Sequence, residues 1–464
     1  MTARLSVGRA TWLITAILLA VWAPPAGAGE DAAGNATRGI APCLATLNSY
    51  LVAAADNNAE LRAAFDEWRA AQQTAPQASS LPDPRLTYGY YIQPVETRTG
   101  PQRQRFGLSQ GFPWFGTLSA KEREAVLKAD ARRARFESLR LKVFRDVKDA
   151  YYEYAYLAQA IGVTEENIEL TRYLEEVVTA RYKANLTPYS EVIKLQVSLG
   201  KLEDRLASLK DLRSPVAARL NAAMNRPVTQ PVPLPEEIPV MTTSMTDKEL
   251  LQGILEKNPA LDEYRALAKA SEARREAAEL NYYPGFAVGV ETILQDSARD
   301  GDPINNGENP LVATLSVNLP IWQEPRDAAV RQAELDKSAW RQRMISAGDS
   351  LSRSMQLALY GYRDAGRRME LYHDALLPKA EQGLGATLEA FQAGEASALD
   401  LVDAERSLLE FELAYLRALA DQAQRMAEME AILGEEIPCD VHGAALDTSR
   451  TSGRDRSVRP KDKP

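Results

Sequence analysis

Two long stretches of the chain carry apolar residues at helical spacing. Between Thr117 and Thr187 there is no proline and a single glycine, Gly162. Apolar side chains recur there every three or four residues, at Val143, Val147, Ala150, Tyr154, Leu157 and Ile161. This period predicts a helix. At about 1.5 Å per residue the helix would be roughly 100 Å long, and a globular domain has no room for it.

A second predicted helix follows a break at residues 185–188, which read Asn-Leu-Thr-Pro. Its apolar positions alternate steps of three and four, at Val192, Leu195, Leu199, Leu202, Leu206 and Leu209. Such spacing is typical of a coiled coil. We therefore expect two long helices joined by a tight turn, a helical hairpin over residues 117–223.

Four shorter segments alternate apolar and polar side chains, which is typical of strands. They form two pairs, residues 84–93 with 103–112 and residues 284–293 with 311–320. Each has about ten residues, the length that a tilted strand needs to cross a bilayer. An amphipathic sheet packed on helices would show the same alternation. The apolar positions of the first pair are Leu86, Tyr88, Tyr90, Ile92, Phe106, Leu108 and Phe112.

The same landmarks occur twice in the same order. Asn58 and the residues after it correspond to Asn258 with a shift of 200, and Glu191 corresponds to Asp400 with a shift of 209. A tandem duplication explains this order. We predict a first repeat over residues 43–235, a linker over 236–244 and a second repeat over 245–438. The second helical hairpin is expected over 325–434, with a kink or local unwinding at Pro378.

The two ends of the chain differ from the repeats. Arg4 and Arg9 precede an apolar run and the small residues Ala26-Gly27-Ala28, which predicts a secretory signal over residues 1–28, followed by an extension over 29–42. The polar tail, residues 439–464, is predicted to be disordered. Cys43 and Cys439 stand at the ends of the repeats, and in an oxidising compartment they could form a disulfide or remain separate thiols.

Composition narrows the functional classes. The formal net charge of −9 argues against nucleic acid and suits a passage for cations. The only histidines, His373 and His442, form no cluster with metal-ligand spacing. No nucleophile elbow or phosphate-binding loop accompanies them. We therefore expect neither an enzyme nor a cofactor or metal site.

Four strands cannot close a barrel, and an open sheet edge in lipid leaves backbone groups unpaired. Strands of membrane length would therefore have to be shared between several copies of the chain. Three copies would supply twelve strands, an even number within the usual range for such barrels. Three copies would thus form a homotrimer in contact with membrane lipid.

The duplicated hairpins and strand pairs resemble the TolC-type outer membrane efflux proteins over residues 43–438. The resemblance implies a mainly α fold, in which three copies form a twelve-stranded barrel in the outer membrane and a twelve-helix tunnel in the periplasm. It also implies a periplasmic membrane fusion protein as adaptor and an inner-membrane pump, of the resistance-nodulation-division type, as partners. The implied function is export of small molecules or metal cations.

The resemblance implies two kinds of site. The helical turns would form the tips that dock onto the adaptor, through Tyr182, Asn185, Leu186, Thr187, Phe391, Gly394, Glu395 and Ala396. Asp400 and Asp403 match the segment that forms a cation-selective constriction in some members, with Glu191 as the counterpart in the first repeat. Lys194 stands where a second acidic residue would be needed there. Ala396 replaces an arginine that acts as a closing latch in the family.

The strand-to-helix segment at residues 112–118, Phe-Pro-Trp-Phe-Gly-Thr-Leu, resembles the branch that serves cobalt, zinc, cadmium or copper efflux. Two alternatives stay open. A type I secretion channel has similar junctions. A periplasmic coiled-coil scaffold or adaptor would explain the helices, although not the strand pairs.

Overall fold

The computed structural model describes residues 42–235 and 238–442, which belong to one compact unit beginning at Pro42. The predicted signal and nearly all of the N-terminal extension lie outside the described residues. The first repeat contains α1 (Pro42–Asn57), α2 (Ala59–Gln72), α3 (Thr74–Ser79), β1 (Arg85–Val95), β2 (Gln102–Phe112), α4 (Thr117–Lys183) and α5 (Tyr189–Ala223).

The second repeat shows the same order of helices, strand pair and long hairpin. It is preceded by β3 (Val240–Thr243) and contains α6 (Asp247–Lys257), α7 (Pro259–Leu280), β4 (Phe286–Gln295), β5 (Leu311–Val317), α8 (Glu324–Glu370), η1 (Leu371–Leu376), α9 (Leu377–Ala393) and α10 (Ala398–Leu433), followed by β6 (Cys439–His442). The strand bounds differ from the predicted ones by up to three residues. Most of the described chain is helical, as predicted.

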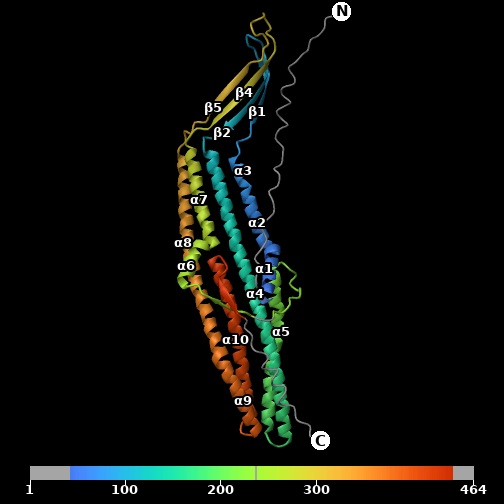
Figure 1. Cartoon of the computed structure of the whole chain (residues 1–464). Helices are drawn as coiled ribbons and strands as arrows, with labels where there is room; N and C mark the ends of the chain where they lie inside the picture. The colour runs from blue at the N-terminus through green and yellow to red at the C-terminus, as the bar shows by residue number, and fades with distance from the viewer. Residues whose placement is uncertain (1–41, 236–237, 443–464) are drawn as a thin grey trace, which may run out of the picture. The chain divides into compact units, whose positions relative to one another are not determined.

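The four long strands form one antiparallel sheet in the order β1-β2-β4-β5, which lies beyond the ends of the long helices (Figure 1). Directly paired residues, such as Leu86 with Leu108 and Leu108 with Val290, lie on the same side of the sheet. The predicted apolar faces therefore merge into one. This face is exposed: the relative exposure is 73% at Leu86 and 70% at Leu315.

The opposite face of the sheet carries small and polar side chains. Gly107 pairs with Thr87 on one side and with Glu291 on the other. Arg105 donates to the Glu291 carboxylate across the strands. The predicted division into an apolar face and a polar face is therefore present in the structure.

The helices bury a continuous apolar core between the two hairpins. α4 packs against α5, α7 and α10, and α8 packs against α7 and α10. α10 is densely lined with buried side chains, among them Leu401, Leu408, Leu416, Met426 and Leu433. Burial of their apolar stripes explains why α4 and α10 are stable far beyond the usual length. On α5 only Val192 and Leu195 of the predicted coiled-coil stripe are buried, and the leucines from Leu199 to Leu209 are half-buried.

The predicted irregularity at Pro378 is confirmed. A π-helical turn, Leu371–Leu376, ends just before this residue, and α9 starts at Leu377. Proline has no N–H to donate and its ring collides with the carbonyl group one turn earlier. A wider turn accommodates both effects without ending the helix.

The predicted linker, residues 236–244, and the predicted disordered tail, residues 439–464, each contain a short strand that was not expected. Cys439–His442, which were assigned to a disordered tail, form β6 and pair with β3 inside the predicted linker. The pairing joins segments about 200 residues apart, so no local pattern could show it. Residues 443–464 lie outside the described residues.

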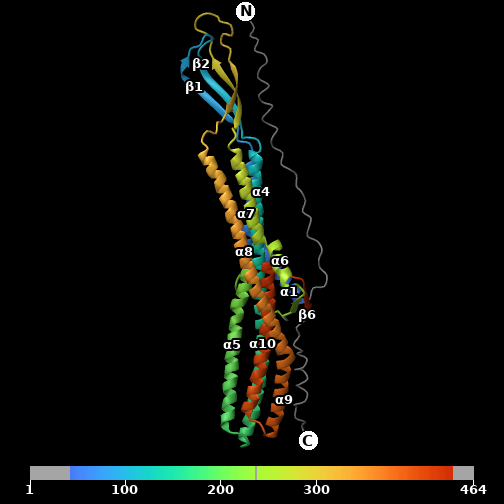
Figure 2. The same ribbon diagram turned by 90° about the vertical axis from the view of Figure 1, so that its left-hand side faces the viewer.

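Two asparagines at equivalent positions join helices in both repeats. The Asn58 side chain accepts from Leu61 N at 3.0 Å and donates to the Ala223 carbonyl at 3.0 Å, where α5 ends. Asn258 accepts from Ala260 N at 2.9 Å and donates to the Ile432 carbonyl at 2.6 Å, near the end of α10. α2 thus lies end to end with α5, and α7 lies end to end with α10 (Figures 1 and 2).

We expect Asn258→Ala to lower the free energy of unfolding by about 2 kcal/mol, because a buried carbonyl and a helix N-terminus both lose their partner. Asn58→Ala should cost about 1 kcal/mol, because Asn58 is less buried and its carbonyl partner can reach water. Chemical denaturation of both variants tests the order. Asn258→Ser, which keeps a cap acceptor and is too short to donate to the Ile432 carbonyl, should fall between wild type and Asn258→Ala. Equal losses at the two positions would contradict the assignment.

Candidate functional site

The two helical turns have the same backbone geometry. Asn185 and Gly394 occupy equivalent positions with φ angles of 58° and 83°. Leu186 N donates to the Arg181 carbonyl at 2.9 Å, and Glu395 N donates to the Ala390 carbonyl at 2.8 Å. A left-handed residue with this hydrogen bond is the usual way to end a helix, and asparagine tolerates the conformation better than most residues.

The aromatic residues of the two turns have different environments. Phe391 is 3% exposed, whereas its counterpart Tyr182 is 41% exposed and lies 5.1 Å from the ring of Tyr189. Leu186 and Glu395 are exposed and Ala396 packs against the core. Both turns are exposed, but the exposed tyrosine and leucine at the tip come from the first repeat.

Arg181 links the two turns, and sequence reasoning missed it. Its guanidinium carbon lies 4.6 Å from the centre of the Phe391 ring, and the group donates to the Phe391 carbonyl. The contact joins residues 210 positions apart, on different hairpins. In the second repeat, Ala396 occupies the position of the latch arginine that the resemblance implied. Arg181 of the first repeat nevertheless places a guanidinium group at the second turn. A search for latch residues within one repeat could not find it.

A cleft of about 380 Å3 lies beside Arg181, between the ends of α4 and α9. Apolar side chains form most of its lining, and Arg181 supplies a positive charge. The lining includes Tyr173, Leu174, Val177, Leu186, Leu388 and Phe391. This cleft could receive an apolar side chain of a partner that also presents an acceptor.

Each of the three candidate constriction carboxylates has a partner within the protomer. Asp400 accepts from Ser397 N at 2.9 Å and from its hydroxyl at 2.8 Å, which holds the pKa of Asp400 below its usual range. Asp403 is exposed and pairs with Arg406 at 3.2 Å. Glu191 accepts from the Thr187 hydroxyl and from Ala398 N at 3.5 Å. The side chain of Glu191, on α5, therefore reaches the first residue of α10, two positions before Asp400.

Glu405 is a buried acid that the sequence-based search did not select. It is 2% exposed on α10 and accepts from the Thr171 hydroxyl of α4 at 2.7 Å. Burial raises the pKa of Glu405 to about 7. One turn before Thr171, the amide oxygen of Asn167 is buried without a partner. The pattern contained a signal, because Glu405 lies between Leu401 and Leu408 in the apolar stripe.

The predicted disulfide is untested. The Cys439 sulfur is half-buried, and burial raises the pKa of its thiol. The Cys43 side chain lies outside the described residues. Within residues 42–235 and 238–442 no three His, Cys, Asp or Glu side chains come together as a metal site. In the same ranges no helix has the length and apolar character to span a membrane.

Duplicated long helical hairpins joined to a four-stranded sheet with an exposed apolar face define a channel protein of the TolC type. The family model described as outer membrane efflux protein matches residues 50–226 and 250–435, one segment in each repeat. The chain belongs to this family. The predicted family is thereby confirmed, and the chain is an outer membrane channel component of a tripartite efflux pump.

Individual relatives are similar to the chain over most of their length. Cobalt-zinc-cadmium resistance protein CzcC of Cupriavidus metallidurans is 23% identical over 396 residues, covering 84% of this chain and 90% of the relative. Nodulation protein T of Rhizobium leguminosarum bv. trifolii is 20% identical over 409 residues, covering 84% and 85%. The structure of the outer membrane protein VceC of Vibrio cholerae superimposes with a TM-score of 0.68 at 18% identity, covering 85% and 97%.

The raised pKa of Glu405 predicts a pH-dependent stability. In the folded state the Glu405 carboxyl keeps its proton up to about pH 7, whereas in the unfolded chain it loses the proton near pH 4.5. The contribution of Glu405 to the free energy of unfolding is therefore fully present below pH 4.5 and is lost as the pH rises to about 7. A shift of this size corresponds to about 3 kcal/mol. Glu405→Gln should remove the decline between pH 5 and pH 7. Glu410→Gln, an exposed acid on the same helix, should leave it unchanged; a decline that survives Glu405→Gln would contradict the assignment.

Proposed function

We propose that three copies of the chain close one conduit, with a twelve-stranded barrel in the outer membrane and a helical tunnel in the periplasm. The observation that carries the proposal is the sheet itself. Within the described residues, β1 and β5 are edge strands without a second neighbour, and the apolar face is exposed. A barrel shared by three copies would pair both edges and present that face to lipid.

The helical part of this conduit extends into the periplasm. α4 has 67 residues, which at about 1.5 Å per residue gives roughly 100 Å. The two turns at its far end, residues 184–188 and 394–397, are then the periplasmic tips. They dock onto a membrane fusion protein, which in turn contacts an inner-membrane pump of the resistance-nodulation-division type. The cleft beside Arg181 and the exposed Tyr182 and Leu186 support this role.

The cargo is small molecules or metal cations. The relation to a cobalt-zinc-cadmium resistance protein and the acidic balance of the chain favour cations. Asp400, Asp403 and Glu191 lie within two turns of the tip, and three copies would bring nine such carboxylates around one axis. Like charges so arranged attract cations and repel anions without tight coordination.

Membrane fractionation, detergent extraction and mass determination of the native particle test the assembly. We expect a heat-sensitive trimer in the outer membrane fraction. A periplasmic scaffold would instead dissolve after osmotic shock. A soluble monomer or dimer would overturn the conduit.

Single-channel recording tests the constriction. Asp400→Asn with Asp403→Asn removes two negative charges per protomer and keeps an acceptor for the Ser397 cap. We expect the cation-to-anion permeability ratio to fall about tenfold, a change of about 1.4 kcal/mol in relative barrier height. Glu410→Gln removes one exposed charge further along α10 and should change the ratio little. An unchanged ratio in the double variant would place the constriction elsewhere.

A further inference from the structure

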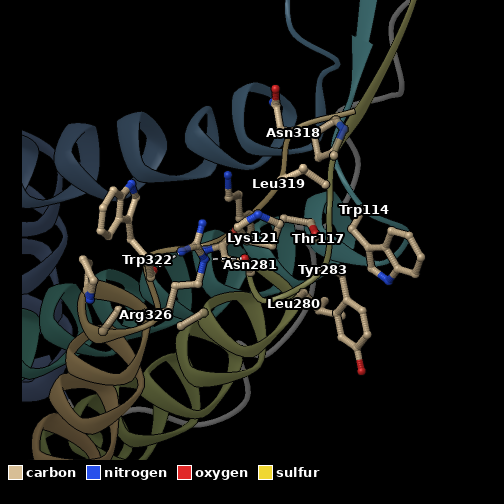
Figure 3. Close-up of a pocket in the computed structure, with 16 residues that line it drawn as sticks. Trp114, Thr117, Lys121, Leu280, Asn281, Tyr283, Asn318, Leu319, Trp322 and Arg326 are labelled. Atoms are coloured by element: carbon tan, nitrogen blue, oxygen red, sulfur yellow. Dashed lines mark hydrogen bonds between the residues drawn. The ribbon is translucent and has the colours of Figure 1, made fainter. Parts of the chain in front are cut away.

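A cleft of about 560 Å3 lies where the strands meet the helices (Figure 3). It is formed by the N-terminal end of α4, the C-terminal end of α7 and the segment between β5 and α8. The segment at residues 112–118, singled out in the sequence for its resemblance, provides one wall. No role in transport requires this cleft, so its lining calls for a separate explanation.

Thr117 carries a polar group without a partner at this cleft. The residue is 3% exposed and lines the cleft, and its hydroxyl oxygen has no hydrogen-bond partner within the described structure. An unpaired buried hydroxyl costs free energy of folding, whereas a bound acceptor would offset that cost. The hydroxyl therefore points to a ligand that accepts hydrogen bonds.

The start of α4 favours an anion at the same place. Gly116 is the N-cap residue and offers no side-chain acceptor, and the first turn contains no acidic residue. Thr117 N donates to the Trp114 carbonyl at 3.1 Å. The next backbone N–H groups of the first turn have no partner in the helix, and the helix dipole adds partial positive charge there. Such a terminus binds phosphate readily. Thr117 and this terminus thus attract the same kind of group.

Two cations complete the set. Lys121 lies one turn after Thr117 on the same face of α4, and Arg326 reaches the cleft from α8. Arg326 donates to the carbonyls of Asn281 and Trp322, and in the part of the chain that the structure describes neither cation pairs with a carboxylate. The nearby Asp327 is not part of the lining and accepts from Tyr282. Both cations are therefore available to an anion that enters the cleft.

Aromatic and apolar side chains surround the cations. Trp114 stacks on Tyr283 with ring centres 5.1 Å apart, and Trp322 and Leu319 are each 74% exposed. Figure 3 shows the ends of Lys121 and Arg326 between Trp322 on one side and the Trp114–Tyr283 stack on the other. A ligand that fits both parts has a phosphate next to hydrocarbon.

We propose that this cleft binds the phosphate of an anionic phospholipid headgroup, with the acyl chains along Trp322 and Leu319. The inference rests on the proposed barrel, which places the strand-to-helix junction at the periplasmic surface of the outer membrane. Tryptophan and tyrosine favour such interfaces, and the uncompensated charge of Lys121 and Arg326 complements an anionic headgroup rather than a zwitterionic one. A neighbouring protomer that presented acceptors would be the competing occupant, and crosslinking distinguishes it below.

Native mass spectrometry of the detergent-purified trimer tests the proposal. Wild-type trimer is titrated with phosphatidylglycerol, with phosphatidylcholine of the same acyl chains, and with inorganic phosphate. We expect selective binding of phosphatidylglycerol, weakened about tenfold in Lys121→Gln with Arg326→Gln. Lys128→Gln is the matched control, because Lys128 lies on the same helix but pairs with Glu124 outside the cleft.

Thr117→Val separates ligand binding from folding. Because the hydroxyl has no partner in the protein, its removal should leave the stability of the lipid-free trimer equal or higher while weakening phosphatidylglycerol binding. A loss of stability without lipid would show a structural role and overturn the assignment of this group.

Other outcomes identify what fails. Equal binding of the two lipids, or binding unchanged in the double variant, overturns the lipid site while the trimer stands. Displacement of the lipid by millimolar phosphate reassigns the cleft to a free anion. Crosslinking of Trp322→Cys between protomers assigns it to a second copy of the chain. Recovery of a soluble monomer overturns the barrel and the lipid site together.

Discussion

The backbone groups at the two edges of the β1-β2-β4-β5 sheet set the main constraint on this molecule. Water can satisfy such groups in a soluble protein, but hydrocarbon cannot. With its apolar face outward, the sheet fits a lipid environment only when other copies pair with β1 and β5. The long hairpins depend on the same requirement, because they are joined directly to the strands and must follow any symmetry that the barrel imposes.

Local patterns predicted the parts of the fold that depend on periodicity. The helical hairpins, the two strand pairs and the common apolar face follow from spacings of three, four and two residues. The β3–β6 pairing and the contact of Arg181 with Phe391 join residues about 200 positions apart, and no spacing carries that information. Glu405 lies within an apolar stripe that is visible in the sequence. A single acid among leucines is equally consistent with a solvent-exposed edge and with a buried, protonated carboxyl, and only its neighbours on α4 distinguish the two.

The two repeats share their framework and differ in their chemistry. Asn58 and Asn258 make equivalent contacts, and Asn185 and Gly394 adopt the same backbone conformation. By contrast, Tyr182 is exposed where Phe391 is buried, and only the second repeat has the capped Asp400 and the π-helical turn before Pro378. A duplicated chain can alter one copy of a turn while the other copy keeps the hairpin intact. Three identical chains would thus present six tips of two alternating kinds.

The asparagine contacts have a mechanical consequence. At Asn58 the end of α5 meets the start of α2, and at Asn258 the end of α10 meets the start of α7. No peptide bond joins the helices of either pair there, so hydrogen bonds from the asparagine side chain connect them. α4 passes the same level without interruption. A twist at the tips would therefore meet covalent bonds along α4, but side-chain hydrogen bonds and packing at the asparagine junctions. The protomer thus combines helices with an unbroken backbone, α4 and the run from α8 to α9, with two pairs of helices that are held end to end by side-chain contacts.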